Sequence, residues 1–274
     1  MDEAVKVIDI EKAIRNSKSR FVSKLPKFVI RMIEKLIDQD YMNDVIQKNN
    51  DKSGIPFINS VLKEWNIKIE VKGASNVPES GRFVFVANHP LGGIDALAFL
   101  STIYSFFPNV ISPSNQLFNY IPHLKPVILG VNVFGTNTKD TVEKFNKLFE
   151  SDNQIMIFPA GLVSRKEHGV VSDLEWQKTF ITKSVQFKRD IIPVHISGVN
   201  SNLFYRVANL RKSLGIKMSV EIILLPREMH KKRNTNLTLT IGKPISFNSI
   251  TSEIPHPEWA CKIRSIVYSL PGKN

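Results

Sequence analysis

The sequence predicts an α/β fold, in which helices cover a mixed, largely parallel sheet and a basic amphipathic helical segment comes first. Short apolar runs at 83–87, 154–158 and 191–198 have the length and the β-branched, aromatic composition of buried strands. Helical patterns separate these runs, and strands that alternate with helices are typical of a largely parallel sheet. The chain has 274 residues, 42% of them hydrophobic, which suffices for one sizeable core.

Residues 1–65 are predicted to form a helical segment that associates with a membrane surface. Pro26 suits the first turn of a helix that runs to about Ile37. Apolar residues recur along this helix at steps of three and four positions: Phe21, Leu25, Phe28, Val29, Met32, Ile33, Leu36 and Ile37. Basic residues lie mostly outside that stripe: Arg20, Lys24, Lys27, Arg31 and Lys35. Such a helix can lie in a membrane interface, its stripe can pack on the main domain, or both can hold together.

Residues 66–274 are predicted to form the main domain. Ile67, Ile69 and Val71 alternate with charged residues, which predicts a half-buried strand. A break in the secondary structure is expected at Ser112-Pro113-Ser114. The other predicted strands cover residues 83–87, 127–135, 154–158, 191–198, 220–225 and 237–242. The predicted helices begin at Ala96, at 136–138, at the capping box Ser172-Asp173-Leu174-Glu175, at Asn200 and at 257–258.

The net charge of +12 favours anionic partners, which include nucleic acid, an anionic membrane surface and phosphorylated substrates. No nucleic-acid partner is expected, because zinc-finger spacing, ribonucleoprotein-type aromatic motifs and a basic region followed by heptads are all missing from the sequence. The single cysteine excludes an intrachain disulfide and a multi-cysteine metal site. We expect neither a signal peptide nor a membrane-spanning helix, since the start is acidic and no apolar run approaches about 20 residues.

One loop carries the residues best suited to chemistry, between the strand at 83–87 and the helix that follows it. It contains His89, Gly92, Gly93 and Asp95, and ligands bind at such strand ends in open α/β sheets. Histidine titrates near neutral pH, and a nearby carboxylate can fix its tautomer. The glycines allow a sharp turn and a close approach to the backbone. The alternative is structural: His89 caps the strand end and Asp95 caps the helix.

A second polar loop, 159–165, follows the strand at 154–158. Ser164 and Arg165 offer a hydroxyl and a guanidinium, which suit a phosphate or a carboxylate. Lys178 is a candidate for the same acceptor or anion site, although a lysine on a helix is usually only solvated. His195, on the strand at 191–198, is more often a satisfied core histidine than a catalytic one.

These two loops resemble motifs of the glycerolipid (1-acylglycerol-3-phosphate) acyltransferase family, and the resemblance spans about residues 67–246. The first family motif has four residues between a histidine and an aspartate; here five separate His89 from Asp95, and looping out of Gly92-Gly93 can absorb the extra residue. The second motif is Phe-Pro-Glu-Gly, in which Ala160 replaces the glutamate. The form of residues 88–93 is typical of a bacterial branch, often called hemolysins, that includes enzymes acylating ornithine or glycine lipids.

The resemblance implies that residues 66–274 are an acyltransferase domain. In the family's mechanism His89 is the general base, Asp95 orients its imidazole, and the acceptor attacks a fatty acyl thioester directly. Backbone N–H groups near Gly92, Gly93 or Gly161 are candidates for an oxyanion site. A Gly-x-Ser-x-Gly nucleophile motif is missing, which is consistent with direct attack. No metal and no cofactor are expected beyond the co-substrate, acyl-CoA or acyl carrier protein.

Three functions remain open from the sequence. The first is transfer of an acyl group to the hydroxyl of a lysophospholipid or lyso-aminolipid. The second is N-acylation that makes the amide of an amino-acid lipid such as an ornithine or glycine lipid. The third is a non-catalytic membrane-binding module of the same fold. In each case the protein is expected at the cytoplasmic face of the membrane, bound peripherally to anionic lipid.

Overall fold

The computed structural model describes residues 7–16, 23–115, 121–131, 138–216 and 219–271. Its strands are β1 Lys68–Lys72, β2 Phe83–Ala87, β3 Val110–Asn115, β4 Ile128–Val131, β5 Gln154–Ile157, β6 Arg165–Glu167, β7 Val170–Ser172, β8 Asp190–Ile196 and β9 Asn236–Ile241. Its helices are α1 Ile10–Arg15, α3 Lys27–Leu36, α4 Gln39–Lys48, α5 Gly54–Glu64, α6 Gly93–Tyr104, α7 Lys139–Glu150, α8 Thr179–Gln186, α9 Asn202–Ser213, α10 Leu225–Lys231 and α11 His256–Ser269.

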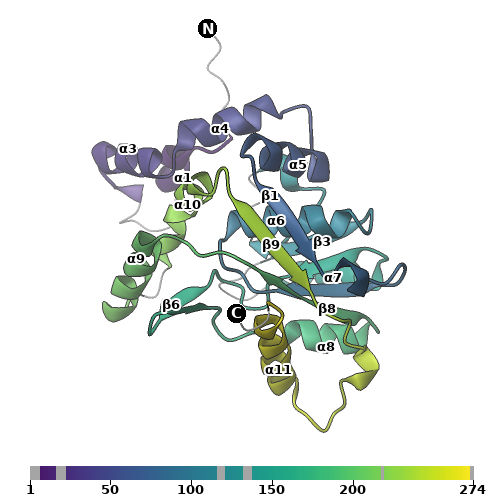
Figure 1. Ribbon diagram of the computed structural model, residues 1–274. Helices are drawn as coiled ribbons and strands as arrows, with labels where there is room; N and C mark the ends of the chain where they lie inside the picture. Colours follow the sequence, from purple (N-terminus) through teal and green to yellow (C-terminus); the bar gives the residue numbers. More distant parts are fainter. Residues whose placement is uncertain (1–6, 17–22, 116–120, 132–137, 217–218, 272–274) are drawn as a thin grey trace.

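Seven strands form one sheet in the order β1-β9-β8-β2-β5-β3-β4 (Figure 1). Neighbouring strands run parallel except for β8 and β9, which pair antiparallel. The strands β6 and β7 form a separate antiparallel hairpin. The predicted α/β class and the mixed, largely parallel sheet are therefore confirmed.

The central strand β2 explains how the core is divided between the two faces of the sheet. All five of its residues are buried, and successive side chains of a strand point to opposite faces. Phe83, Phe85 and Ala87 join the apolar cluster that includes α5 and α6. Val84 and Val86 join the cluster on the other face, with residues of α7, α8 and α11. Burial on both faces is why this strand is continuously apolar.

The N-terminal helices pack on this core, and the predicted helix after Pro26 is present as α3. Residues of α4 and α5 belong to the same buried cluster as β2. In α3, Ile30 is buried while Phe28 and Met32 are 72% and 61% exposed. Phe21, at the start of the predicted stripe, lies outside the described residues. None of the described helices is both long and apolar enough to cross a bilayer. The division at residue 65 stays a prediction.

Three local predictions are wrong. The expected break at 112–114 lies within β3, where these residues pair in parallel with β4. The apolar run 220–225, predicted as a strand, is a 3₁₀ turn at Val220–Leu224 that leads into α10. A short apolar run does not distinguish strand from helix, and Pro226 in the first turn favours the helix. The capping box at 172–175 opens no helix, since Ser172 ends β7 and the next helix, α8, begins at Thr179.

Candidate active site

The loop between β2 and α6 is held to the neighbouring strand, β8, by hydrogen bonds. The side chain of Asn88 accepts a hydrogen bond from the N–H of Ile196 at 2.7 Å and donates one to its carbonyl at 2.9 Å. Gly92 has a φ of +94°, a backbone conformation that favours glycine. These features place the His89 side chain at the carboxyl end of the central strand, as the sequence predicted.

His89 and Asp95 are paired despite the five residues between them. The Nδ1 atom of His89 lies 3.1 Å from Oδ2 of Asp95. The Asp95 carboxylate is fully buried, and it accepts hydrogen bonds from the N–H groups of Leu91 at 2.8 Å and Gly92 at 3.2 Å. The imidazole stacks on the ring of Phe158, with 3.9 Å between centroids. When Nδ1–H donates to Asp95, Nε2 carries the lone pair that a general base needs.

A second buried carboxylate, Asp173, supports the same loop, although its sequence pattern predicts only a helix cap. Its Oδ1 atom accepts from the N–H of His89 at 3.1 Å and from the hydroxyl of Ser164 at 2.5 Å. Its Oδ2 atom accepts from the indole of Trp176 at 2.9 Å. The N–H of Ser164 also donates to the carbonyl of His89 at 2.8 Å. Asp173 therefore connects the two polar loops that the sequence singled out.

Arg165 lies in the interior rather than at an open anion site. Its guanidinium is 2.5 Å from the buried carboxylate of Glu221 and also donates to the carbonyl of Val163. Arg211 pairs with the other oxygen of Glu221 at 2.9 Å. Burial lowers the pKa of Arg165, and Glu221 partly offsets that effect. Because its donors face protein groups, the anion-binding role of Arg165 stays a prediction without geometric support.

The remaining candidates are dispersed. The N–H of Gly92 is directed to Asp95 and that of Gly161 to the carbonyl of Phe158 at 2.9 Å, so neither faces a substrate oxyanion. Gly93 opens α6, where first-turn N–H groups have no intrahelical partner. Lys178 is exposed just before α8. In the described part of the chain, no three His, Cys, Asp or Glu side chains are grouped to hold a metal.

His195, on β8, is half-buried near the Asp173 carboxylate. Burial lowers the pKa of its imidazole, and the Asp173 carboxylate opposes that effect only in part. Its ring meets that of Tyr268 edge-on, with 6.0 Å between centroids. Burial also raises the pKa of the Tyr268 phenol to about 12. The phenol oxygen accepts a hydrogen bond from the N–H of Asp173 at 2.7 Å. Tyr268 therefore contacts the residue whose carboxylate binds the N–H of His89.

The sequence model of an acyltransferase family matches residues 12–270 of this chain. The chain belongs to that acyltransferase family. A lyso-glycine lipid O-acyltransferase from Bacteroides thetaiotaomicron is 38% identical over 98% of this chain and 99% of that protein. One from Phocaeicola vulgatus is 37% identical over 98% of this chain and 97% of that protein. A 1-acyl-sn-glycerophosphate acyltransferase structure from Thermotoga maritima matches with 18% identity and a TM-score of 0.44, over 90% of this chain and 98% of that one.

This acyltransferase departs from the glycerolipid family's second motif at Ala160. The side chain of Ala160 is buried in the apolar cluster that also contains Trp176. The carboxylate of Asp173 accepts a hydrogen bond from the indole of Trp176, which belongs to the same cluster. Because it also accepts hydrogen bonds from the N–H of His89 and the hydroxyl of Ser164, Asp173 is expected to position the two loops.

Asp173→Asn is expected to destabilise the acyltransferase. The amide nitrogen would face either the Trp176 indole N–H or the donors from His89 and Ser164, which leaves a buried donor unpaired. Such a loss costs about 1–3 kcal/mol. Urea unfolding followed by circular dichroism measures it, with Glu175→Gln as the control because Glu175 is exposed two residues away. Equal unfolding midpoints for the two variants would contradict this role.

Proposed function

We propose that this acyltransferase moves a fatty acyl group from an acyl thioester to the hydroxyl of a lyso-glycine lipid. The observation that carries the proposal is the pairing of His89 Nδ1 with Asp95 Oδ2 at 3.1 Å. It occurs in a chain that matches, over 98% of its length, two proteins named lyso-glycine lipid O-acyltransferases. The acyl donor is acyl-CoA or acyl carrier protein.

In the proposed reaction, Nε2 of His89 removes the proton from the acceptor hydroxyl. The hydroxyl oxygen attacks the thioester carbonyl, an ester forms, and the carbon–sulfur bond breaks. The thiolate leaves and takes up the proton from His89, so that charge and atoms balance. Asp95 keeps Nδ1 protonated and stabilises the imidazolium that forms meanwhile, the division of labour known from serine hydrolases.

The enzyme is proposed to act while bound peripherally to anionic lipid at the cytoplasmic face of the membrane. The helix α3 exposes Phe28 and Met32 next to the basic residues Lys27 and Arg31. An apolar face beside cationic side chains is the combination that attracts a helix to an anionic interface. The lipid acceptor and a fatty acyl donor would then be available from the same surface.

The test is release of free thiol from palmitoyl-CoA and from palmitoyl acyl carrier protein. Each donor is combined with lyso-glycine lipid, lysophosphatidic acid, glycine or ornithine, with His89→Ala as the control. We expect release that depends on lyso-glycine lipid and disappears in His89→Ala. Release with free glycine or ornithine would indicate N-acylation instead. Release without an acceptor would indicate a thioesterase, and silence with all acceptors would contradict the proposal.

A further inference from the structure

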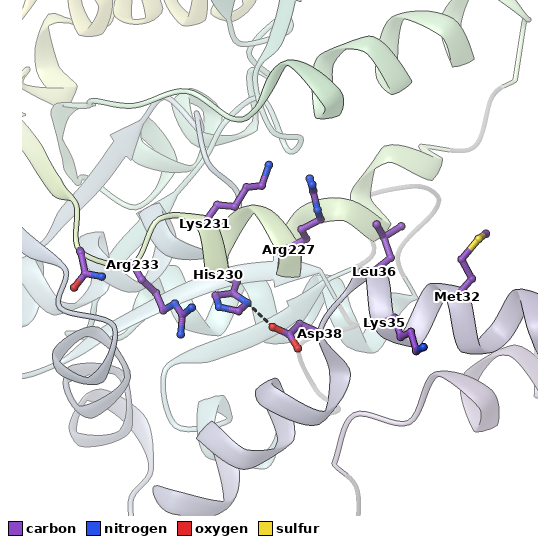
Figure 2. A pocket seen from close by; sticks show the side chains of 9 residues that line it. Met32, Lys35, Leu36, Asp38, Arg227, His230, Lys231 and Arg233 are labelled. Carbon is purple, nitrogen blue, oxygen red and sulfur yellow. Dashed lines mark ion pairs between the residues drawn. The ribbon is translucent and has the colours of Figure 1, made fainter.

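A cavity of about 880 Å³ lies between α3 and α10, outside the His89 loop (Figure 2). Four basic residues line it, namely Lys35, Arg227, Lys231 and Arg233, against a single carboxylate, Asp38. Asp38 forms an ion pair with His230 and is thereby already engaged. The positive charge of this lining exceeds its negative charge, which favours an anionic ligand.

The helix α10 separates this cavity from the catalytic loop. A Cβ atom on Gly92 would lie 2.9 Å from Leu225, and one on Gly93 would lie 2.3 Å from Met229. Leu225 and Met229 are four residues apart and therefore share the face of α10 that packs on the loop. Arg227 and Lys231, also four apart, are on the opposite face and line the cavity. The cavity is thus next to the active site but distinct from it.

Arg227 and Lys231 present their charged groups on the same side of α10. Figure 2 shows both groups extending from that side of α10, with Leu36 of α3 close to α10 and Met32 farther along α3. The Nη1 atom of Arg227 is buried and forms an ion pair with Glu228 at 3.5 Å, so this nitrogen faces the protein. The Arg227 side chain as a whole is 31% exposed. A partly exposed guanidinium beside an ammonium group suits a phosphate.

The surroundings of the cavity point to a phosphate carried by a lipid. Met32 is 61% exposed at its edge. On α9, Leu203 and Leu210 are exposed, as is Leu214 at its C-cap, and the three recur at helical spacing on one stripe. Leu36 of α3 packs against a buried cluster that contains Leu224, next to α10, and residues of α9. Figure 1 shows α3, α10 and α9 along one side of the molecule, so the exposed apolar residues of α3 and α9 belong to the same side as the cationic cavity.

We propose that this cavity binds the phosphate head group of one anionic membrane phospholipid, with Arg227 and Lys231 as its ligands. The acyl chains of that lipid run over Met32 and Leu36 toward the bilayer. Its binding would hold the α10 side of the enzyme against the membrane, with the His89 loop on the other face of that helix. The inference rests on the proposed peripheral membrane association and does not require any particular acyl acceptor.

The test is binding of dihexanoyl phosphatidylglycerol, below its micelle concentration, to the full chain by calorimetry. We expect saturable binding of one molecule per chain, and binding at least about tenfold weaker in the double variant Arg227→Gln/Lys231→Gln. Lys63→Gln/Lys68→Gln is the matched control, because it removes two positive charges from exposed positions in α5 and β1, outside the cavity lining. Circular dichroism melting of each variant verifies that it is folded before its binding is compared.

Several results would overturn the inference. Equal affinity in the two double variants would contradict a binding site at Arg227 and Lys231. Equal affinity for dihexanoyl phosphatidylcholine would contradict a preference for anionic lipid. Binding of inorganic phosphate with the same affinity as the lipid, in the same calorimetric measurement, would assign the cavity to free phosphate. The readout does not involve acyl transfer. An enzyme inactive toward every acceptor that still binds phosphatidylglycerol would therefore contradict the proposed function and leave this inference in place.

Discussion

His89→Ala is expected to lower kcat for acyl transfer by about a thousandfold, while the protein stays folded. Loss of a general base costs a factor of about 10²–10⁴ in rate, and no other imidazole in the described structure is paired with Asp95. The Asp95 carboxylate keeps its hydrogen bonds from backbone N–H groups, so the loop retains its support. Initial rates at saturating donor and acceptor measure the effect.

Two further variants separate base catalysis from packing. His89→Gln retains a polar side chain that can still lie over Phe158, but an amide does not accept a proton at neutral pH, so it is expected to be as inactive as His89→Ala. His168→Asn replaces an exposed histidine in the β6–β7 turn with a residue that tolerates its positive φ, and full activity is expected. Activity of His89→Gln above about a tenth of wild type would contradict a general base at this position.

Glu221→Gln is expected to reduce the free energy of unfolding by about 3–5 kcal/mol, which is the largest stability effect that we predict. Glu221 is fully buried and is paired with both Arg165 and Arg211. Its neutralisation leaves two cationic groups close together with no compensating charge. Urea unfolding followed by circular dichroism gives the difference from the wild-type protein.

The matched control is Glu167→Gln. Like Glu221→Gln, it removes a carboxylate that is paired with a basic residue of α9. Glu167 pairs with Lys212 at 2.7 Å, and both side chains are more than half exposed. Solvent screens such a pair, so we expect no measurable change in stability. Indistinguishable unfolding curves for Glu221→Gln and Glu167→Gln would show that the buried cluster contributes nothing.

The parts of the fold that the sequence predicted are those with a local signal. The strand β2 and the helix α6 follow from apolar composition over a few residues, and the loop between them follows from its glycines, histidine and aspartate. The pairing of His89 with Asp95 was also accessible, because the two are six positions apart. The N-terminal helix α3 was recognised by the period of its apolar residues, as amphipathic helices usually are.

What the sequence did not predict depends on long-range partners. Asp173 lies 84 positions from His89, and its local pattern is that of a helix cap. The sequence predicts an anion site at Arg165. Its actual partner, Glu221, could not be recognised because it is 56 positions away, in a segment predicted as a strand. The sequence predicts that Gly92 and Gly93 allow a substrate to approach the backbone. In the structure, the missing side chains instead make room for Leu225 and Met229 of α10. A carboxylate flanked by apolar residues was the available signal for Glu221.

The most direct test of the proposed function is the identity of the product formed from palmitoyl-CoA or palmitoyl acyl carrier protein and lyso-glycine lipid. Mass spectrometry is combined with mild alkaline hydrolysis, which cleaves an ester and leaves an amide intact. We predict that the wild-type enzyme adds one acyl chain that mild alkali removes, and that His89→Ala forms none of this product. An alkali-stable acyl chain, or product formation by His89→Ala at the wild-type rate, would contradict O-acylation by the His89–Asp95 pair.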